Sequence, residues 1–152
     1  MLTTDQQEKA GELSLGLEWG YADLSEAIAW ADAIIQDASI IDDDIFGISL
    51  AKEPYAAISY LNNISNTSDE WKVLRLFLKR FDGMTTLPFD RTSSLAKHLY
   101  MKCSYDKNAP ADMACFSHHW DGIDLAVSGV LGDPNVAVSE FLADVKKFAN
   151  GP

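Results

Sequence analysis

The chain has 152 residues, the length of one ordinary domain, and its 47% hydrophobic and 11% aromatic content is typical of a globular protein. Its net charge of −11 repels phosphate groups and anionic lipids, so we expect neither a nucleic-acid nor a membrane partner. No apolar stretch is long enough to span a bilayer, no export signal opens the sequence, and Cys103 and Cys115 are too few for a disulfide scaffold, so we expect a cytoplasmic protein.

Helical spacing dominates the first forty residues. Thr4 and Gln7 have the spacing of a capping box, which predicts a first helix that ends near Gly16. Asp23 and Glu26 have the same spacing and predict the start of a second helix. Its apolar face recurs with a period near 3.6 residues through Leu24, Ala27, Ile28, Trp30, Ala31, Ile34 and Ile35.

Two further helices are predicted in the middle of the chain. Pro54 is suited to the first turn of one, because its missing amide would be unpaired there anyway. Ser68 is expected to cap the next, which runs to Gly83 with acids in its first turn and bases in its last. The stretch 84–92 is predicted to be a loop.

The remaining sequence also predicts helices. Ser93 or Ser94 is expected to open one helix, and residues 111–120 form another. Residues 123–131, after a glycine, are compatible with either a helix or a short strand. Asp133, followed by a proline, predicts the start of a last helix. The expected fold is all-α, a single compact domain over residues 1–152 with six to eight helices.

The charge is unevenly distributed along the chain. Residues 1–70 hold fourteen acidic and two basic side chains, a net charge of −12, whereas residues 71–152 have a net charge of +1. The whole excess therefore belongs to the first half, which predicts an acidic surface there.

The acidic run from Asp42 to Glu53 partly resembles a calcium-binding loop. Such a loop needs oxygen ligands at positions 1, 3 and 5, a glycine at 6 and a glutamate at 12. Asp42, Asp44, Gly47 and Glu53 fit, but Phe46 stands at position 5 without an oxygen ligand. We therefore expect a solvated acidic loop rather than a metal site, with calcium binding as an alternative.

A second candidate is the pair His118 and His119, followed by Asp121 and Asp124. Imidazole and carboxylate groups bind zinc or transfer protons, so a small hydrolase-type enzyme is another alternative. Adjacent side chains on a helix point about 100° apart and rarely share an ion. We therefore expect one packed and one exposed histidine, no metal, no cofactor and no catalytic residue.

The segment around Trp19 and Tyr21 mixes aromatic and acidic residues just before the second predicted helix. Such residues are preferred anchors at protein interfaces, and the surrounding acids would attract a basic partner. Packing into the core is an equally good interpretation of both rings. Trp30 lies on the apolar face and is expected in the core.

The block LEWGYADLSEAIAWADAII and the closing VSEFLADVKKFA resemble small bacterial immunity proteins, which accompany secreted or contact-delivered toxins. That resemblance implies an acidic cytoplasmic protein that neutralises a cognate toxin domain by covering its active or essential surface. It assigns no role to an individual residue. From charge and aromatic content we expect the partner-binding residues to be Glu18, Trp19, Tyr21, Asp23, Glu26, Asp42, Asp43, Asp44 and Phe46.

Overall fold

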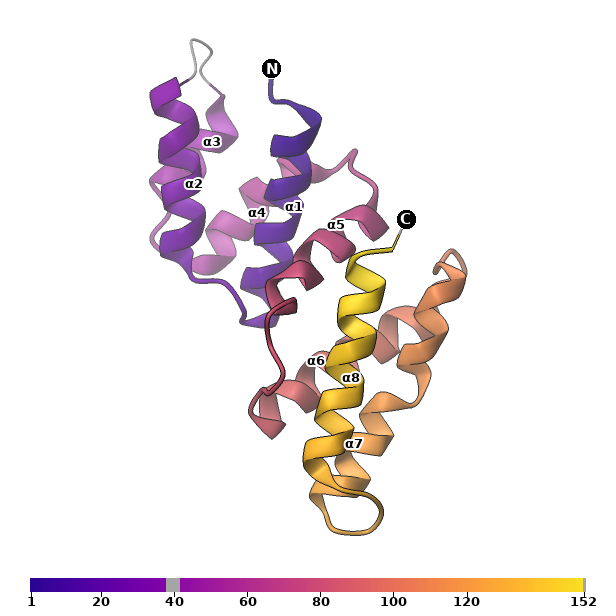
Figure 1. Ribbon diagram of the computed structural model, residues 1–152. Coiled ribbons are helices and arrows are strands. Elements are labelled where there is room, and N and C mark those ends of the chain that lie inside the picture. Colours follow the sequence, from indigo (N-terminus) through magenta and orange to yellow (C-terminus); the bar gives the residue numbers. More distant parts are fainter. Residues whose placement is uncertain (38–41, 152) are drawn as a thin grey trace. The chain divides into compact units, whose positions relative to one another are not determined.

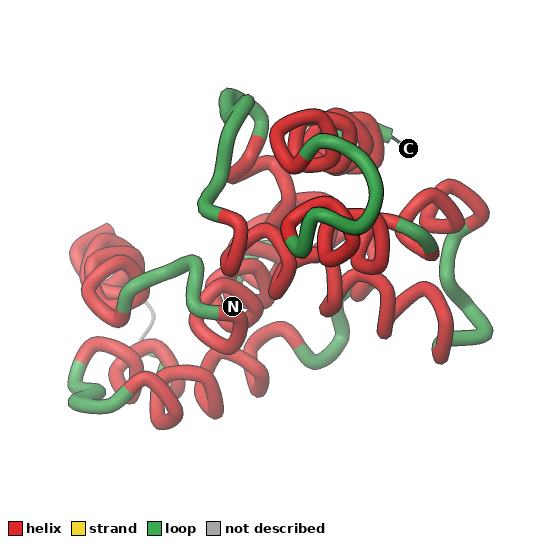
Figure 2. Tube along the Cα trace, turned by 90° about the horizontal axis from the view of Figure 1, so that it is seen from below, coloured by secondary structure: helices red, strands yellow, loops and turns green. Residues whose placement is uncertain are grey.

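The computed structural model describes residues 1–37 and 42–151, and within them it contains helices and no strand (Figures 1 and 2). Eight α-helices and two 3₁₀ helices are present in these residues, which confirms the all-α class and the expected number of helices. The helices are α1 (Thr4–Trp19), α2 (Leu24–Asp37), α3 (Asp43–Ser49), α4 (Pro54–Ser65), α5 (Glu70–Leu78), η1 (Lys79–Phe81), α6 (Phe89–Tyr105), η2 (Ala111–Ser117), α7 (His119–Val127) and α8 (Pro134–Ala149).

The chain folds into two compact units, Met1–Phe77 and Leu78–Pro152, which we call the N-terminal and C-terminal units. In the N-terminal unit α1 packs against α4, and α3 packs against both α2 and α4. In the C-terminal unit α6 packs against α7 and η2, and α8 packs against α7. The single domain over residues 1–152 stays a prediction.

Each unit has an apolar core made by the predicted stripes. In the N-terminal unit one cluster of buried side chains comes from α1 to α4, with Leu13, Ile45, Ile48 and Leu61 completely or almost completely enclosed. Trp30 packs at the edge of this cluster and is only partly buried. The prediction that Trp30 lies in the core is therefore confirmed only in part.

The core of the C-terminal unit centres on Phe116. Its ring makes edge contacts with Phe141 and Phe148, at centroid distances of 6.2 and 5.7 Å. All three side chains are buried. Since Phe116 lies in η2 and the other two lie in α8, these rings join the two elements.

Several predicted helix ends are wrong by a few residues. The first capping box uses Thr3 and Gln6 rather than Thr4 and Gln7, with both reciprocal hydrogen bonds formed. The helix continues past Gly16 to Trp19 and ends at Gly20, whose φ of 80° is the left-handed conformation that glycine adopts most readily.

Two later starts are corrected in the same way. Asp69, not Ser68, precedes α5, and its carboxylate accepts a hydrogen bond from the amide of Trp71 at 2.9 Å. Helix α6 begins at Phe89, directly after Pro88. This start lies inside the predicted loop and before Ser93.

Other boundaries are confirmed. Pro54 is the first residue of α4, and Asp133 caps α8, which begins with a proline.

Residues 111–120 form a 3₁₀ helix and then the start of α7, rather than one continuous helix. Residues 119–127 are helical, which decides the helix-or-strand alternative for the first part of 123–131.

Alanine substitution at two glycines inside helices is expected to change the stability of the fold in opposite directions. A Cβ on Gly11 in α1 would lie 2.9 Å from a methyl carbon of buried Val73, whereas a Cβ on Gly122 in α7 would meet nothing within 4 Å. We expect Gly11→Ala to lower the free energy of unfolding by about 1–3 kcal/mol through overpacking. Gly122→Ala should raise it by about 0.5–1 kcal/mol, because alanine loses less backbone entropy in a helix.

Urea denaturation followed by circular dichroism measures both changes. The two variants serve as controls for each other, since the chemical change is identical. A stabilising Gly11→Ala would show that the packing between α1 and α5 relaxes without cost.

Candidate functional site

His118 and His119 lie at a break between two helices. The 3₁₀ helix η2 ends at Ser117, and α7 begins at His119. His118 stands between them with φ −120° and ψ −13°, outside the helical conformation. The two imidazole rings are therefore not separated by the angle of a regular helix, and their centroids are 4.4 Å apart. The expectation that the two rings diverge is wrong.

His119 is held firmly in the C-terminal unit. Its side chain is buried between Phe116 and Phe141, at ring centroid distances of 6.4 and 5.3 Å. Its Nε2 atom lies 2.6 Å from Oδ2 of Asp144 in α8, in a hydrogen bond that links α7 to α8. His118 is exposed, so the prediction of one packed and one exposed histidine is confirmed.

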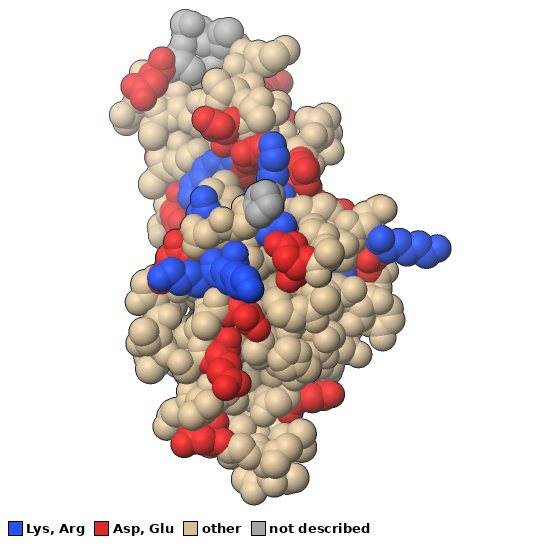
Figure 3. All heavy atoms as spheres, turned by 45° about the vertical axis from the view of Figure 1, so that its right-hand side comes forward, with Lys and Arg blue, Asp and Glu red and all other residues tan. Residues whose placement is uncertain are grey.

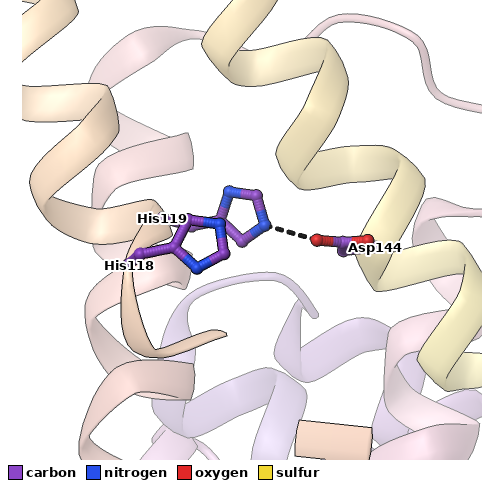
Figure 4. A group of neighbouring side chains, drawn as sticks. All are labelled: His118, His119 and Asp144. Atoms are coloured by element: carbon purple, nitrogen blue, oxygen red, sulfur yellow. Dashed lines mark hydrogen bonds and ion pairs between the residues drawn. The ribbon is translucent and has the colours of Figure 1, made fainter. Parts of the chain in front are cut away.

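Asp144 completes a cluster with the two histidines (Figure 4). One potential ligand atom from each of His118, His119 and Asp144 lies within 4.8 Å of the other two. In the described ranges, 1–37 and 42–151, no other three His, Cys, Asp or Glu side chains converge in this way. Sequence reasoning missed Asp144, which is 25 residues from His119.

Asp121 and Asp124, the carboxylates predicted to act with the histidines, do not join this cluster. Both are exposed, and Asp124 accepts a hydrogen bond from the hydroxyl of Ser93 in α6 at 2.8 Å. Trp120 likewise faces α6, where its ring lies 5.4 Å from that of Tyr100. This side of α7 therefore anchors it to α6, while His119 faces α8.

Cys115 lies in η2 and is half buried. Burial, and then the negative charges of Asp144 and Asp112, raise the pKa of its thiol to about 11. A thiol with so high a pKa is almost entirely protonated at neutral pH and is a poor nucleophile. The geometry therefore offers no activated cysteine at this position.

The aromatic candidates of the N-terminal unit pack inward in part. The rings of Trp19 and Tyr21 make edge contacts with buried Phe77 at 5.3 and 6.1 Å. Both remain half buried, as does Phe46 in α3. Core packing thus accounts for one side of Trp19 and Tyr21 and leaves the other side accessible.

The calcium-binding loop considered as an alternative is not formed between Asp42 and Glu53. Asp43–Ser49 is helix α3, and the carboxylate of Asp42 caps it by accepting a hydrogen bond from the amide of Ile45 at 3.1 Å. A calcium loop instead winds its ligands around an ion. The acidic run therefore serves as a helix N-terminus, and the solvated loop expected there is also wrong.

Most acids of the N-terminal unit occupy equivalent places. They stand immediately before a helix or in its first turn, where the partial positive charge of the helix stabilises them. These residues are Asp5 in α1, Asp23 and Glu26 at α2, Asp42, Asp43 and Asp44 at α3, Glu53 at α4, and Asp69 and Glu70 at α5.

The two predicted acidic groups lie at opposite ends of α2. Asp23 and Glu26 are at its start, whereas α3 runs back along it, with the hydroxyl of Ser49 bonded to Asp32. Asp42 to Asp44 therefore lie toward the other end, about 20 Å away for a helix of this length. On the face drawn in Figure 3 the acids are scattered, with basic side chains among them, rather than gathered in one patch.

Among the exposed apolar side chains that the prediction missed are two in the N-terminal unit. Leu50, which follows α3, and Tyr55, in the first turn of α4, are 76% and 75% exposed. Both are more accessible than the predicted Trp19, Tyr21 and Phe46. Tyr55 shares helical spacing with buried Leu61 and Ile64, so its exposure is set by tertiary packing rather than by the sequence pattern.

Comparison with models of known protein families, with curated proteins and with solved structures finds no match to this chain. The resemblance to immunity proteins therefore stays a prediction. In the part of the chain that the structure describes, no helix combines the length and the apolar character that crossing a membrane requires.

The two histidines give a matched pair of stability predictions. His119→Ala removes the hydrogen bond to Asp144, which is worth about 1.5–3 kcal/mol if one partner is charged, and leaves a cavity between two phenylalanines. His118→Ala truncates an exposed side chain and should change the free energy of unfolding by less than about 0.5 kcal/mol. Urea denaturation in the presence of EDTA measures both, and equal losses would contradict the structure.

The high pKa of Cys115 predicts slow alkylation. At pH 8 we expect iodoacetamide to modify Cys115 in the folded protein roughly 100-fold more slowly than in urea, because the thiolate is so much scarcer. The rate should rise with pH until about 11. Peptide mass spectrometry measures it, and a fast reaction at pH 7 would contradict the proposed environment.

Proposed function

We propose that the chain is a bacterial cytoplasmic immunity-type protein that binds a cognate, basic toxin domain and occludes its active or essential surface. The observation that carries the proposal is the charge of the N-terminal unit. This unit holds fourteen acidic and four basic side chains, a net charge of −10, and only Glu12 among the acids is buried.

The basic residues do little to offset this charge. Lys9 is paired with Glu12 at 2.8 Å, and Arg75 is buried. Lys52 and Lys72 are the two that are exposed. A domain with this imbalance attracts a basic partner over distances near the Debye length, about 8 Å at physiological ionic strength.

Toxins that act on nucleic acids commonly need a positive cleft for phosphate. An acidic inhibitor complements such a cleft, and electrostatic attraction raises association rates as far as about 10⁸–10⁹ M⁻¹s⁻¹ at low salt. Close contacts then set the residence time of the complex. For this unit we propose Leu50 and Tyr55 as apolar anchors, together with the accessible sides of Trp19, Tyr21 and Phe46.

The first test is neutralisation. The gene next to that of this chain is expected to encode a secreted protein with a toxic C-terminal domain. Expression of that domain alone should stop growth, and co-expression of this chain should restore it through a stable complex. Toxicity that persists in the presence of the folded chain, with no complex in gel filtration, would refute the proposal.

The second test uses variants that remove charge without removing the helix cap. In the triple variant Asp42→Asn, Asp43→Asn, Asp44→Asn, asparagine caps α3 about as well as aspartate does. We expect slower association with the toxin domain and a weaker dependence on salt, measured by surface plasmon resonance at two ionic strengths.

The matched control removes three exposed acids from the C-terminal unit by Asp90→Asn, Asp121→Asn and Glu140→Gln. It changes the total charge equally, so a local acidic surface predicts a smaller effect than that of the α3 variant. Equal effects would show that only total charge matters. A larger effect of the control would place the binding surface on the C-terminal unit.

A further inference from the structure

We infer that His118, His119 and Asp144 form a binding site for one divalent transition-metal ion of the zinc class, in the C-terminal unit. The inference rests on the convergence of two imidazoles and one carboxylate from two different elements. One potential ligand atom from each lies within 4.8 Å of the other two. It departs from the expectation, made from the sequence, that no metal is bound.

The spacing of the ligand atoms is close to that of a metal site. Zinc binds nitrogen and oxygen at about 2.0–2.2 Å, which places the ligands of a tetrahedral site about 3.3–3.5 Å apart. His119 Nε2 and Asp144 Oδ2, now 2.6 Å apart, would separate slightly as an ion replaces the proton between them. The third ligand atom would move inward by about an ångström.

Closing around an ion requires some of the ligands to move, and the three side chains differ in how freely they can turn. His119 is buried and fixed by the rings of Phe116 and Phe141. His118 is exposed, and the side chain of Asp144 is 33% exposed, so both turn without disturbing the core. One fixed ligand and two adjustable ones therefore lie close enough together to bind a single ion (Figure 4).

The ligand set also selects the class of ion. Two imidazole nitrogens and one carboxylate oxygen suit zinc, cobalt, nickel and copper, whereas calcium and magnesium prefer sites made only of oxygen. Three protein ligands leave one tetrahedral position for water, which is the composition of an open zinc site. Since His118 is exposed, that position is accessible from solvent.

The backbone explains why these ligands converge. On one regular helix the two rings would point about 100° apart. The interruption at His118, between η2 and α7, instead brings the ring centroids to 4.4 Å. Helix α8, which packs against α7, then supplies Asp144.

The experiment is a metal titration of the whole chain after EDTA treatment. Isothermal titration with Zn²⁺ should show one site, and Co²⁺ should give the intense visible absorption of a tetrahedral complex. Ca²⁺ and Mg²⁺ should not compete. Binding of metal by the chain alone is independent of toxin binding, so this inference and the proposed function fail or succeed separately.

Three variants make the test specific. His118→Ala and Asp144→Asn each remove one ligand and should weaken Zn²⁺ binding by more than about 100-fold, the upper range for loss of an outer-shell partner. His98→Ala removes a histidine of α6 outside the cluster and should bind Zn²⁺ like the wild type. Circular dichroism verifies that each variant is folded, and His118→Ala is the safest because His118 is exposed.

Thermal unfolding gives a second readout. Zn²⁺ should raise the Tm of the wild type and of His98→Ala, and leave that of His118→Ala unchanged, because an ion that binds only the folded state stabilises it. Equal Zn²⁺ affinity of the wild type and His118→Ala, or the absence of tetrahedral Co²⁺ absorption, would overturn the inference.

Discussion

The first amides of each helix need hydrogen-bond acceptors, and this requirement shapes the molecule more than any other single constraint. Every α-helix leaves four N–H groups unpaired at its start, so a chain that is divided into many short helices has many such groups to satisfy. The N-terminal unit begins five α-helices within 77 residues. Thr3, Asp42 and Asp69 accept hydrogen bonds from these amides directly, and further carboxylates stand beside the same ends.

The acidity of this unit follows in large part from that constraint. Nine of its fourteen acids are at helix starts, whereas no base stands in the last turn of α1 to α4. The charge is therefore structural and also available to a partner, since a carboxylate that accepts one amide hydrogen still carries its full charge. In the proposed function, toxin binding uses a surface that folding already requires. The effects of total charge, local charge and helix stability on binding can therefore be distinguished only with variants that keep the helix cap.

The same constraint shows how far the fold can be predicted from the sequence. Apolar periodicity is a property of whole helices, so the all-α class follows from it. The exact starts depend on which of several neighbouring acceptors faces the free amides. Thr3 and Thr4 are chemically identical, and the backbone selects Thr3. Asp69 replaces Ser68 in the same way. At Asp133 the proline that follows is suited to the first helical position, and the predicted cap is confirmed.

The histidine cluster could not be predicted for a different reason. Periodicity continues from residue 111 to 120 and conceals the interruption at His118, which changes the direction of one side chain but not the apolar pattern. Asp144 is one of several polar residues on α8, and only the packing of α8 against α7 determines that it faces His119. The carboxylates close in sequence, Asp121 and Asp124, turn toward solvent and α6. Convergence of chemical groups in this chain is thus decided by one irregular residue and the packing of one helix pair, and sequence proximity is a poor guide to both.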